Sequence, residues 1–484
     1  MNVLAILMVF VVSFAITLIG GAGWSFVLVY LPALLMLNQL PQLMIPHAPL
    51  MAHWAALYGL ILGLPFRREP LRLRWCTVDT IVVLLLISVT ITAWTTEVFE
   101  TGINSFRTDL LQWTIPYFLA RMLFRDVQIR RRTLNGVIVL VGLMSVAALI
   151  EFRLWPYWYL HLLQNLGMNN HIPVEAYSRY GFFRVAGTVD HPIYFGNMCV
   201  ALLGLIAVLA RTSGLKLSTP WVALGLFGAF GCVITSISFT PYMGMLAGGG
   251  FFLLLVGSRR ARMLLVPIVL VAIIGGIVVT YQIAQQPLGE RPQGNQLEDS
   301  MFVRRMIVIE SWKKAVEAGP FGFGLRYDFV HDTTGDDDGH YNLASVDNSY
   351  MQFTMTRGWV YTALWLSIAV FFAGRMTIAF SRVSHRSQVV PLALCTATVL
   401  GLMVSMYTVW AGGLYTVVWL IVLGLSNTLI DLVLYPELRQ VAVQPAGAIP
   451  SVRAVAPAMG AGSYGGAAAL AHSSGGAATM QHRM

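Results

Sequence analysis

The chain has 484 residues, of which 57% are hydrophobic and only 11% are charged, and its formal net charge is +9. Because an ordinary soluble domain carries about 25% charged residues, this composition excludes a soluble globular protein. The basic residues stand in short clusters between apolar runs rather than in a stripe with aromatic side chains, so the positive charge does not indicate nucleic-acid binding. The lipid bilayer is the partner that the composition predicts.

Thirteen apolar runs approach the roughly 20 residues that a helix needs to cross a bilayer core about 30 Å thick. In chain order they are 4–19, 24–40, 50–65, 78–96, 108–124, 134–151, 190–210, 220–237, 240–256, 264–281, 348–373, 389–409 and 412–434. The first run resembles the core of a signal peptide, but it lacks a basic start and leads directly into the second, which favours a retained helix. Since the first two runs are short, we expect about 12–13 transmembrane helices.

Basic clusters separate these runs and assign the two sides of the membrane. They are found at 67–74, 125–132, 211–216, 259–262 and 375–386. All fall on one side if the helices alternate in direction, and the positive-inside rule makes that side cytoplasmic. With thirteen spans the N-terminus lies outside. We therefore expect a multi-pass protein of a bacterial inner membrane.

Two external segments are longer than simple connections. Segment 152–189 is rich in Trp and Tyr, which suits the headgroup interface. Segment 282–347 contains an expected amphipathic helix at 302–318 followed by a Gly-rich stretch at 319–324, and its length indicates a function. Toward the C-terminus the chain turns to Ala, Gly, Pro and Ser, which predicts disorder. The expected parts are N-terminal transmembrane helices at 1–180, a functional core at 181–434 and a disordered cytoplasmic tail at 435–484.

Ionisable groups at the external ends of the apolar runs are the candidates for chemistry, because charges near hydrocarbon are costly and often functional. Arg184 precedes the seventh run. Arg304 and Arg305 begin the amphipathic helix, and Asp347 begins the eleventh run. Each also has a simpler explanation. Arg184 could anchor the chain to lipid headgroups, Arg304 and Arg305 could lie on a solvated helix face, and Asp347 could be a helix N-cap. No Cys or His spacing typical of a metal site occurs, so no metal or other cofactor is expected.

The order of these motifs resembles the O-antigen ligase and Wzy-type polymerase superfamily. The matching residues are Arg184, Gly187, His191, Pro192, Arg305, the stretch 320–324, Asp347, Asn348, Tyr350, Gly358 and Tyr361. The resemblance covers about residues 180–430 and implies an all-α polytopic fold, similar to GT-C glycosyltransferases, with a large periplasmic loop that carries short helices. It also implies a polyprenyl-diphosphate-linked sugar donor that reacts on the periplasmic side without a metal.

The resemblance implies roles for these side chains. Arg184 and Arg305 would stabilise the negative charge that grows on the diphosphate leaving group, since a guanidinium pairs with phosphate oxygens and stays charged. Asp347 would activate or orient the acceptor hydroxyl. The residues expected to bind substrate are Arg304, His191, Asn348, Tyr350 and His340.

The chain departs from the family's ligase pattern at two places. Ligases typically carry a His where this chain has Asp347, which favours the polymerase branch, with the upstream His340 as an alternative imidazole. Relatives often show Ser-Arg-Gly within the segment that is 235–240 here, and this chain has no Arg there. One contact to the lipid donor would then be missing or supplied from elsewhere.

The leading interpretation is a periplasm-facing glycosyltransferase that polymerises undecaprenyl-diphosphate-linked oligosaccharide repeats into O-antigen or exopolysaccharide. A chain-length regulator or other polysaccharide assembly proteins are its expected partners. The first alternative is a ligase that transfers finished polymer to lipid A core or to protein. The second is a transporter of polysaccharide or lipid-linked sugar, which the lack of a detectable internal repeat and of charges in the middle of most runs disfavours.

Overall fold

The computed structural model describes residues 2–37, 43–45, 48–67, 73–96, 99–166, 178–179, 181–189, 191–287, 296–324, 348–383, 385–409 and 414–438. The chain divides into two units, Met1–Ala442 and Val443–Met484, and all described residues lie in the first. The structure describes residues 435–438 of the predicted tail. Residues 439–484 lie outside the described residues.

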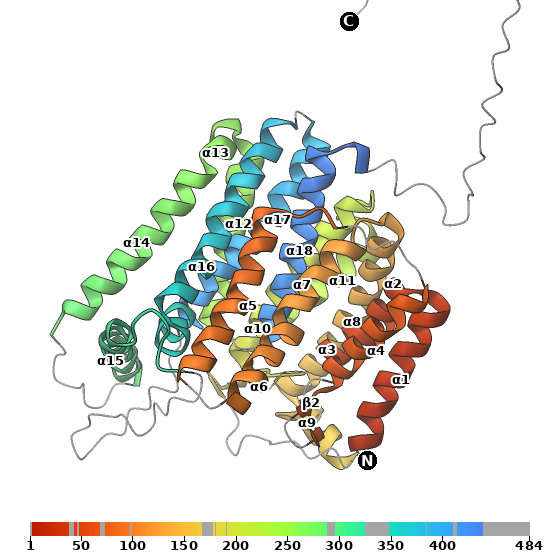
Figure 1. Cartoon of the computed structure of the whole chain (residues 1–484), viewed down its shortest axis with the longest axis horizontal. Helices are drawn as coiled ribbons and strands as arrows, with labels where there is room; N and C mark the ends of the chain where they lie inside the picture. Colours follow the sequence, from red (N-terminus) through yellow and green to blue (C-terminus); the bar gives the residue numbers. More distant parts are fainter. Residues whose placement is uncertain are drawn as a thin grey trace, which may run out of the picture. The chain divides into compact units, whose positions relative to one another are not determined.

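The first unit is a bundle of helices (Figure 1). The helices of its first part are α1 (Asn2–Gly20), α2 (Ala22–Ser25), η1 (Phe26–Tyr30), α3 (Leu31–Leu35), α4 (Ala52–Arg67), α5 (Thr77–Thr96), α6 (Phe99–Asp109), η2 (Leu110–Thr114), α7 (Ile115–Leu123), α8 (Val127–Arg153) and α9 (Trp158–Asn165). Those of its second part are α10 (Pro192–Thr212), α11 (Pro220–Thr235), α12 (Phe239–Gly257), α13 (Arg259–Met263), α14 (Leu265–Gln285), α15 (Gln296–Glu317), α16 (Ser349–Ser381), α17 (Arg386–Ser405), η4 (Met406–Thr408) and α18 (Leu414–Leu434). Two short antiparallel pairs complete the described elements, β1 (Leu43–Ile45) with β2 (Ala48–Leu50) and β3 (Ser178–Arg179) with β4 (Phe182–Phe183).

Each predicted apolar run coincides with a helix or with consecutive helices. Within the described ranges, nine helices are at least 18 residues long and apolar enough to cross a membrane, and two shorter apolar helices, Ala22–Leu35 and Pro220–Thr235, accompany them. The runs 50–65 and 108–124 correspond to α4 and to the continuous rod of α6, η2 and α7. The prediction of an all-α, multi-pass membrane protein is confirmed.

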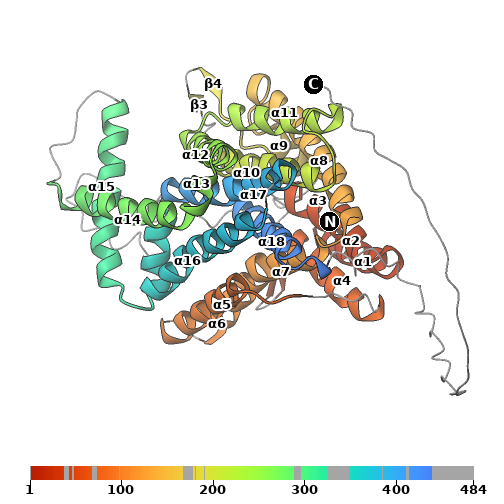
Figure 2. The same ribbon diagram turned by 90° about the horizontal axis from the view of Figure 1, so that it is seen from above.

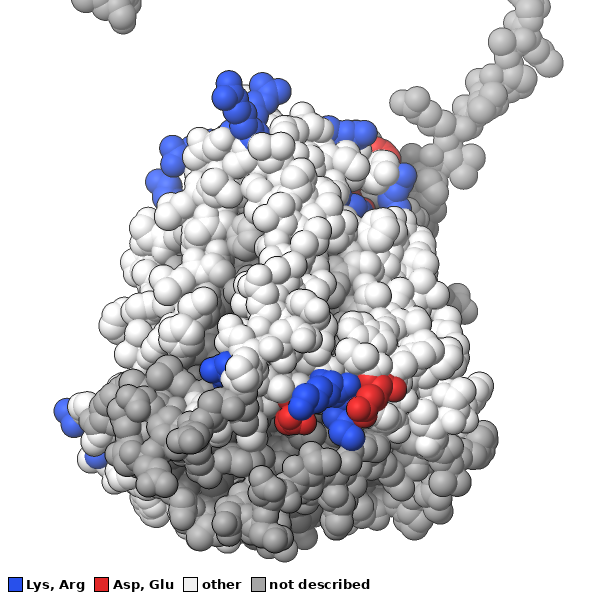
Figure 3. Space-filling model, turned by 90° about the vertical axis from the view of Figure 1, so that its left-hand side faces the viewer, with Lys and Arg blue, Asp and Glu red and all other residues white. Residues whose placement is uncertain are grey.

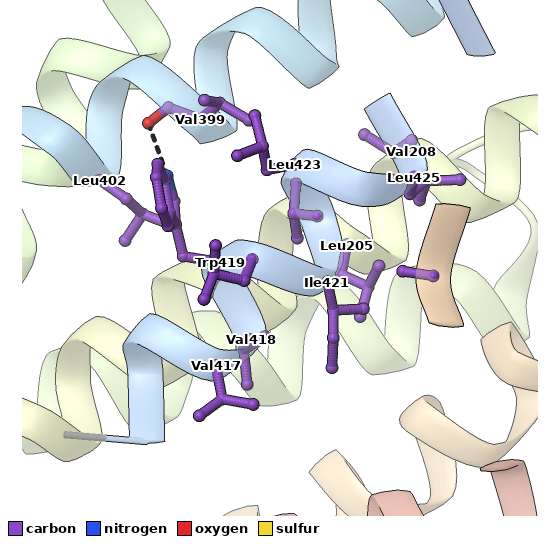
Figure 4. Packing of buried hydrophobic residues seen from close by; sticks show 14 of the residues in the cluster. Leu205, Val208, Val399, Leu402, Val417, Val418, Trp419, Ile421, Leu423 and Leu425 are labelled. Carbon is purple, nitrogen blue, oxygen red and sulfur yellow. Dashed lines mark hydrogen bonds between the residues drawn. The ribbon is translucent and has the colours of Figure 1, made fainter. Parts of the chain in front are cut away.

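The centre of the bundle consists of α10, α17 and α18. Figure 4 shows Leu205 and Val208 of α10 close to the α18 residues Leu423 and Leu425, while the Trp419 indole N–H donates to the Val399 carbonyl at 3.0 Å. In the apolar windows of these three helices 83%, 78% and 89% of the residues are buried, whereas the values for α1 and α14 are 17% and 11%. All of these helices are strongly apolar, so hydropathy alone did not predict which would be central.

Four buried charges connect the helices away from the site. Arg121 of α7 donates from Nε and Nη2 to the two carboxylate oxygens of Asp79 on α5, both at 2.9 Å. Its Nη1 donates to Asp431 of α18 at 2.8 Å, and Arg375 of α16 reaches the other oxygen of Asp431 at 2.5 Å. Two cations thus face two anions, which makes the burial of these charges tolerable.

The surface charges are distributed unevenly along the bundle. Figure 3 shows mainly Lys and Arg at the upper end of this face, an uncharged band beneath them, and a mixture of acidic and basic residues below that band. The basic helix α13 caps two of the predicted spans at the first end. This is the distribution that the predicted positive-inside orientation requires.

Candidate functional site

Arg184 lies in the segment between β4 and α10, against the junction of α11 with α12. Its Nη2 donates to the Ser238 hydroxyl at 2.8 Å, and its Nε to the Ser236 carbonyl at 3.5 Å. Ser238 immediately precedes α12. Both serines belong to segment 235–240, where the resemblance led us to expect an Arg that this sequence lacks. The structure therefore brings a guanidinium to this segment from another part of the chain.

The buried carboxylate of Glu151 holds the backbone next to Arg184. Glu151 lies in the last turn of α8, is 1% exposed, and accepts the N–H groups of Ala186 and Gly187 at 2.9 and 3.0 Å. Gly187 has a φ of 59°, and a Cβ at this position would meet the Phe195 ring at 2.3 Å. Sequence reasoning missed Glu151, although an acidic residue inside an apolar run was a signal for it.

His191 is the N-cap of α10. Its Nδ1 accepts the Ile193 N–H at 3.2 Å, and its ring lies 5.2 Å from that of Tyr194. Burial, together with the positive charge of Arg184, lowers the pKa of His191 to about 4. The predicted residues Arg184 and His191 are therefore close enough to interact, and the histidine is neutral near neutral pH.

Asn348 and Tyr350 lie at the start of α16, as the sequence predicted. The Asn348 Oδ1 accepts the N–H groups of Tyr350 and Met351 at 3.0 and 3.2 Å, so Asn348 is the N-cap. The explanation of Asp347 as the N-cap was therefore wrong, because the cap is one residue later. The Tyr350 hydroxyl donates to the Met403 carbonyl of α17 at 2.7 Å, which fixes this helix end to its neighbour.

The short helix η4 links the beginnings of α12 and α16. The Thr408 hydroxyl donates to the Thr240 hydroxyl at 3.0 Å, and the Thr240 hydroxyl donates to the Thr408 carbonyl at 3.2 Å. The hydroxyl of Ser349 donates to the carbonyl of Val409, the next residue of the chain. The starts of α10, α12 and α16 thus lie at the same end of the bundle as Arg184. Each of these helix N-termini carries a partial positive charge, which favours an anion placed directly at it.

A cavity of about 610 Å³ lies between α12, α14, α16 and α17. Most of its wall is aliphatic or aromatic, and α14 contributes Val269, Ile273 and Ile277. Its polar lining includes Asn348 and Thr408 from the linked helix starts. Figure 2 shows α14 on the outside of the bundle, with α15 crossing beside it. The cavity therefore runs from the linked helix starts along the lipid-facing helix α14.

Arg305 lies on α15, and its Nη2 donates to the carbonyl of Pro287, just after α14, at 2.8 Å. The side chain of Arg304 lies outside the described residues, as do Asp347 and His340. The structure therefore describes the side chains of five predicted site residues, Arg184, His191, Asn348, Tyr350 and Arg305. The role of Asp347 or His340 as the base stays a prediction. Among the residues with described side chains, no three His, Cys, Asp or Glu come together as metal ligands.

Tyr361, another residue of the predicted motif, lies in a buried cluster around Arg357. The Arg357 guanidinium donates to both carboxylate oxygens of Asp109 at 2.7 and 3.2 Å, and to the Tyr361 hydroxyl at 2.6 Å. It also lies 4.6 Å from the centre of the Trp113 ring. Asp109 neutralises this cation, so the cluster holds α16 against α6 and η2.

Part of the cavity wall lies in a segment that matches a known family. Residues 224–366 match the family model of O-antigen ligase. The matched part runs from α11 into α16 and contains Arg305, Asn348 and Tyr350, whereas Arg184 and His191 precede it. This confirms the predicted resemblance and supports a ligase-type or polymerase-type role in O-antigen assembly. A comparison with curated proteins finds no match to the chain.

Proposed function

We propose that this chain is a metal-independent glycosyltransferase of a bacterial inner membrane that polymerises undecaprenyl-diphosphate-linked repeat units into O-antigen or exopolysaccharide. The observation that carries the proposal is Arg184, held between the starts of α10 and α12. The active site faces the periplasm, and a chain-length regulator or other assembly proteins are its proposed partners.

Two features of the site match the two parts of such a donor. The diphosphate would lie at Arg184, because a guanidinium and helix N-termini both favour phosphate oxygens. The polyprenyl chain needs an apolar surface that it can reach from the lipid, and the cavity of about 610 Å³ beside α14 offers one. An amphiphilic donor would therefore present its sugar above the membrane surface.

In the proposed reaction, an acceptor hydroxyl oxygen bonds to the anomeric carbon of the donor sugar. The bond from this carbon to the diphosphate oxygen breaks, and the diphosphate leaves with the electron pair. Arg184 and Arg305 stabilise the charge that develops on it. Asp347 takes or orients the hydroxyl proton, with His340 as the alternative base. His191, Asn348, Tyr350 and Arg304 bind the substrate.

The experiment replaces Arg184 or Arg305 by Ala in the full chain and follows glycan assembly in a strain that lacks the native copy. Removing a group that stabilises developing charge lowers kcat by about 100-fold or more. We therefore expect single lipid-linked repeats to accumulate and long polymer to disappear. Arg153→Ala is the matched control, since Arg153 ends α8 at the same side and lies over the Phe182 ring. If both variants made long polymer at the parental level, the assignment of Arg184 and Arg305 to the active site would be contradicted.

A ligase is the second candidate, and the description of the matching family favours it. The two activities share the donor, and they differ in the acceptor. The glycan profile of the deletion strain distinguishes them, because loss of a polymerase leaves single lipid-linked repeats whereas loss of a ligase leaves long polymer on the lipid carrier. Undelivered long polymer would exclude the polymerase proposal and support the ligase.

A further inference from the structure

Helix α16 is interrupted inside the membrane-spanning segment. At Gly358 the backbone has φ 86° and ψ 173°, values far from those of a helix. In a continuous helix the N–H groups of Trp359 and Val360 would donate to the carbonyls of Met355 and Thr356, four residues back. The interruption frees two donors and two acceptors, and each would be costly to leave unpaired away from water.

The loop 319–324, which directly follows α15, rebonds all four groups. The two freed carbonyls accept the N–H groups of Phe323 and Gly324 at 2.7 and 3.2 Å. The two freed N–H groups donate to the carbonyls of Gly319 and Pro320 at 3.2 and 3.3 Å. The loop is thus inserted into the helix, and we call this arrangement the loop insertion. It supplies a hydrogen-bond partner for each of these four backbone groups.

The loop insertion depends on two glycines that face each other's backbone. A Cβ on Gly322 would lie 2.7 Å from the backbone nitrogen of Arg357, and a Cβ on Gly358 would lie 2.1 Å from the carbonyl oxygen of Pro320. Both glycines also have a positive φ, 74° and 86°. Because the close atoms are backbone atoms, they cannot move aside like the end of a side chain. Larger residues at either position would push the loop away from α16.

The loop insertion also fixes one end of α15. The middle of α15 is tied to the chain just after α14 by the bond from Arg305 to the Pro287 carbonyl. Between Arg305 and the loop, the Trp312 ring lies 5.8 Å from that of Tyr281 on α14 and 6.5 Å from that of Trp359 on α16. Figures 1 and 2 both show α15 crossing the adjacent ends of α14 and α16. Trp312 lines the cavity, so α15 forms a strap across one end of it.

We propose that the loop insertion is the positioning element of the transfer reaction, and that Gly322 and Gly358 are positioning residues. Because the loop is hydrogen-bonded to the interrupted α16, it fixes the position of α15 relative to the cavity. Arg305 and Trp312 lie on α15, so their positions are fixed with it. A displacement of about 1 Å in a reacting group can lower the rate about 100-fold, so the reaction requires such an anchor. This inference rests on the proposed function.

The first arm of the experiment measures the position of α15 without using activity. Ala315 and Met351 are both buried in the contact between α15 and α16, so a cysteine at each position should form a disulfide under a mild oxidant in membranes. The four native cysteines are changed to Ser for this purpose. Gly322→Ala and Gly358→Ala should lower the cross-linked fraction severalfold. Gly374→Ala is the matched control, because its Cβ would come no closer than 4.0 Å to a neighbour outside its own helix.

The second arm measures transfer by the purified full chain from a lipid-linked oligosaccharide in liposomes. We expect kcat to fall about 100-fold in Gly322→Ala and Gly358→Ala, with a smaller change in KM for the donor and parental values in Gly374→Ala. A further variant inserts two glycines after Ala318. This variant leaves loop 319–324 itself unchanged but lengthens its connection to α15, so that the loop no longer fixes the position of the helix. We therefore expect kcat and the cross-linked fraction to fall, and the melting temperature to equal that of the parent.

Two results would overturn the inference. One is a parental cross-linked fraction in both glycine variants, which would mean that the loop does not place α15. The other is a parental kcat in variants that have lost the cross-link, which would mean that the place of α15 does not matter for transfer. If the parent itself transfers no glycan, the proposed function fails, and the cross-linking arm still decides whether the loop insertion fixes α15.

Discussion

A carboxylate buried in an apolar bundle needs a cation or several hydrogen-bond donors. Glu151 has the second kind of environment, because the N–H groups of Ala186 and Gly187 each face one of its oxygens. Those two residues come just after Arg184 in the chain, separated from it by Val185. The side chain at the end of α8 therefore determines the path of the backbone that carries the proposed phosphate-binding Arg184.

Replacing Glu151 by Gln tests this role. The amide keeps one acceptor oxygen but points an NH₂ group at a backbone N–H, so one buried donor loses its partner at a cost of about 1–3 kcal/mol. We expect a lower melting temperature in detergent and transfer activity reduced about tenfold, since the backbone next to Arg184 becomes less well fixed. A melting temperature and activity equal to those of the parent would show that Glu151 does not hold this segment.

Among the candidate residues, the sequence named some positions that lie near one another and missed another, and the roles of all of them stay predictions. Arg184 and His191 were predicted one by one from the motif, and the structure brings them close together. Glu151 was missed, although its place inside an apolar run was a signal, because the groups it binds lie about 35 positions later in the chain. The local sequence marks the buried charge but not the backbone that it holds.

At the scale of elements, the helix starts of the site are built from different caps. His191 caps α10 through its ring nitrogen, and Asn348 caps α16 through its amide oxygen. Only a neutral imidazole can accept the Ile193 N–H through Nδ1. Burial and the charge of Arg184 favour this neutral form, which makes the start of α10 sensitive to acid.

The pH dependence of stability tests the His191 cap. Its pKa is lowered from 6.5 in the unfolded chain to about 4 in the folded protein, so between these values the unfolded chain binds more protons. The His191 contribution to stability is therefore complete above about pH 6.5 and is lost as the pH falls toward 4. We expect the melting temperature to fall over this range, and to fall less in His191→Asn, which keeps a capping side chain that does not titrate. Equal slopes in both proteins would contradict the assignment.

Apolar runs predicted the helices well and their interruptions poorly. The run 348–373 was predicted as one continuous span, and the structure divides it at Gly358. A glycine within an apolar run does not by itself indicate a break, since it lowers helix stability only modestly. The break becomes favourable because the loop 319–324 supplies the missing hydrogen bonds. That loop is more than thirty positions away, so the local sequence does not contain the information.

For the molecule as a whole, the buried ion network of Asp79, Arg121, Arg375 and Asp431 joins α5, α7, α16 and α18. The side chains of Arg121 and Asp79 are fully buried, so neither can recover its hydration if its partner is lost. Removing one member of a buried pair is far more costly than removing an exposed pair. The network therefore fixes the arrangement of four helices that are all apolar and could otherwise pack in other ways.

Arg121→Met tests this contribution. It leaves the Asp79 carboxylate without its cation, and the expected loss in the free energy of unfolding is about 3–5 kcal/mol, measured in mixed micelles. Glu437→Gln is the control, because the 3.7 Å pair of Glu437 with Arg74 is largely exposed and is worth about 0–1 kcal/mol. Comparable losses in the two variants would show that burial does not set the strength of the network.

The sequence by itself determined that the chain is an all-α membrane protein, where its helices lie, and which motifs resemble the O-antigen ligase superfamily. These properties depend on composition and on runs of about 20 residues, which are local. Only the tertiary structure decided that α10, α17 and α18 are central, that Arg184 meets Ser238, and that the loop 319–324 enters α16. In a membrane both lipid and core are apolar, so hydrophobicity cannot say which face of a helix meets another. Close packing and buried hydrogen bonds between distant residues make that choice.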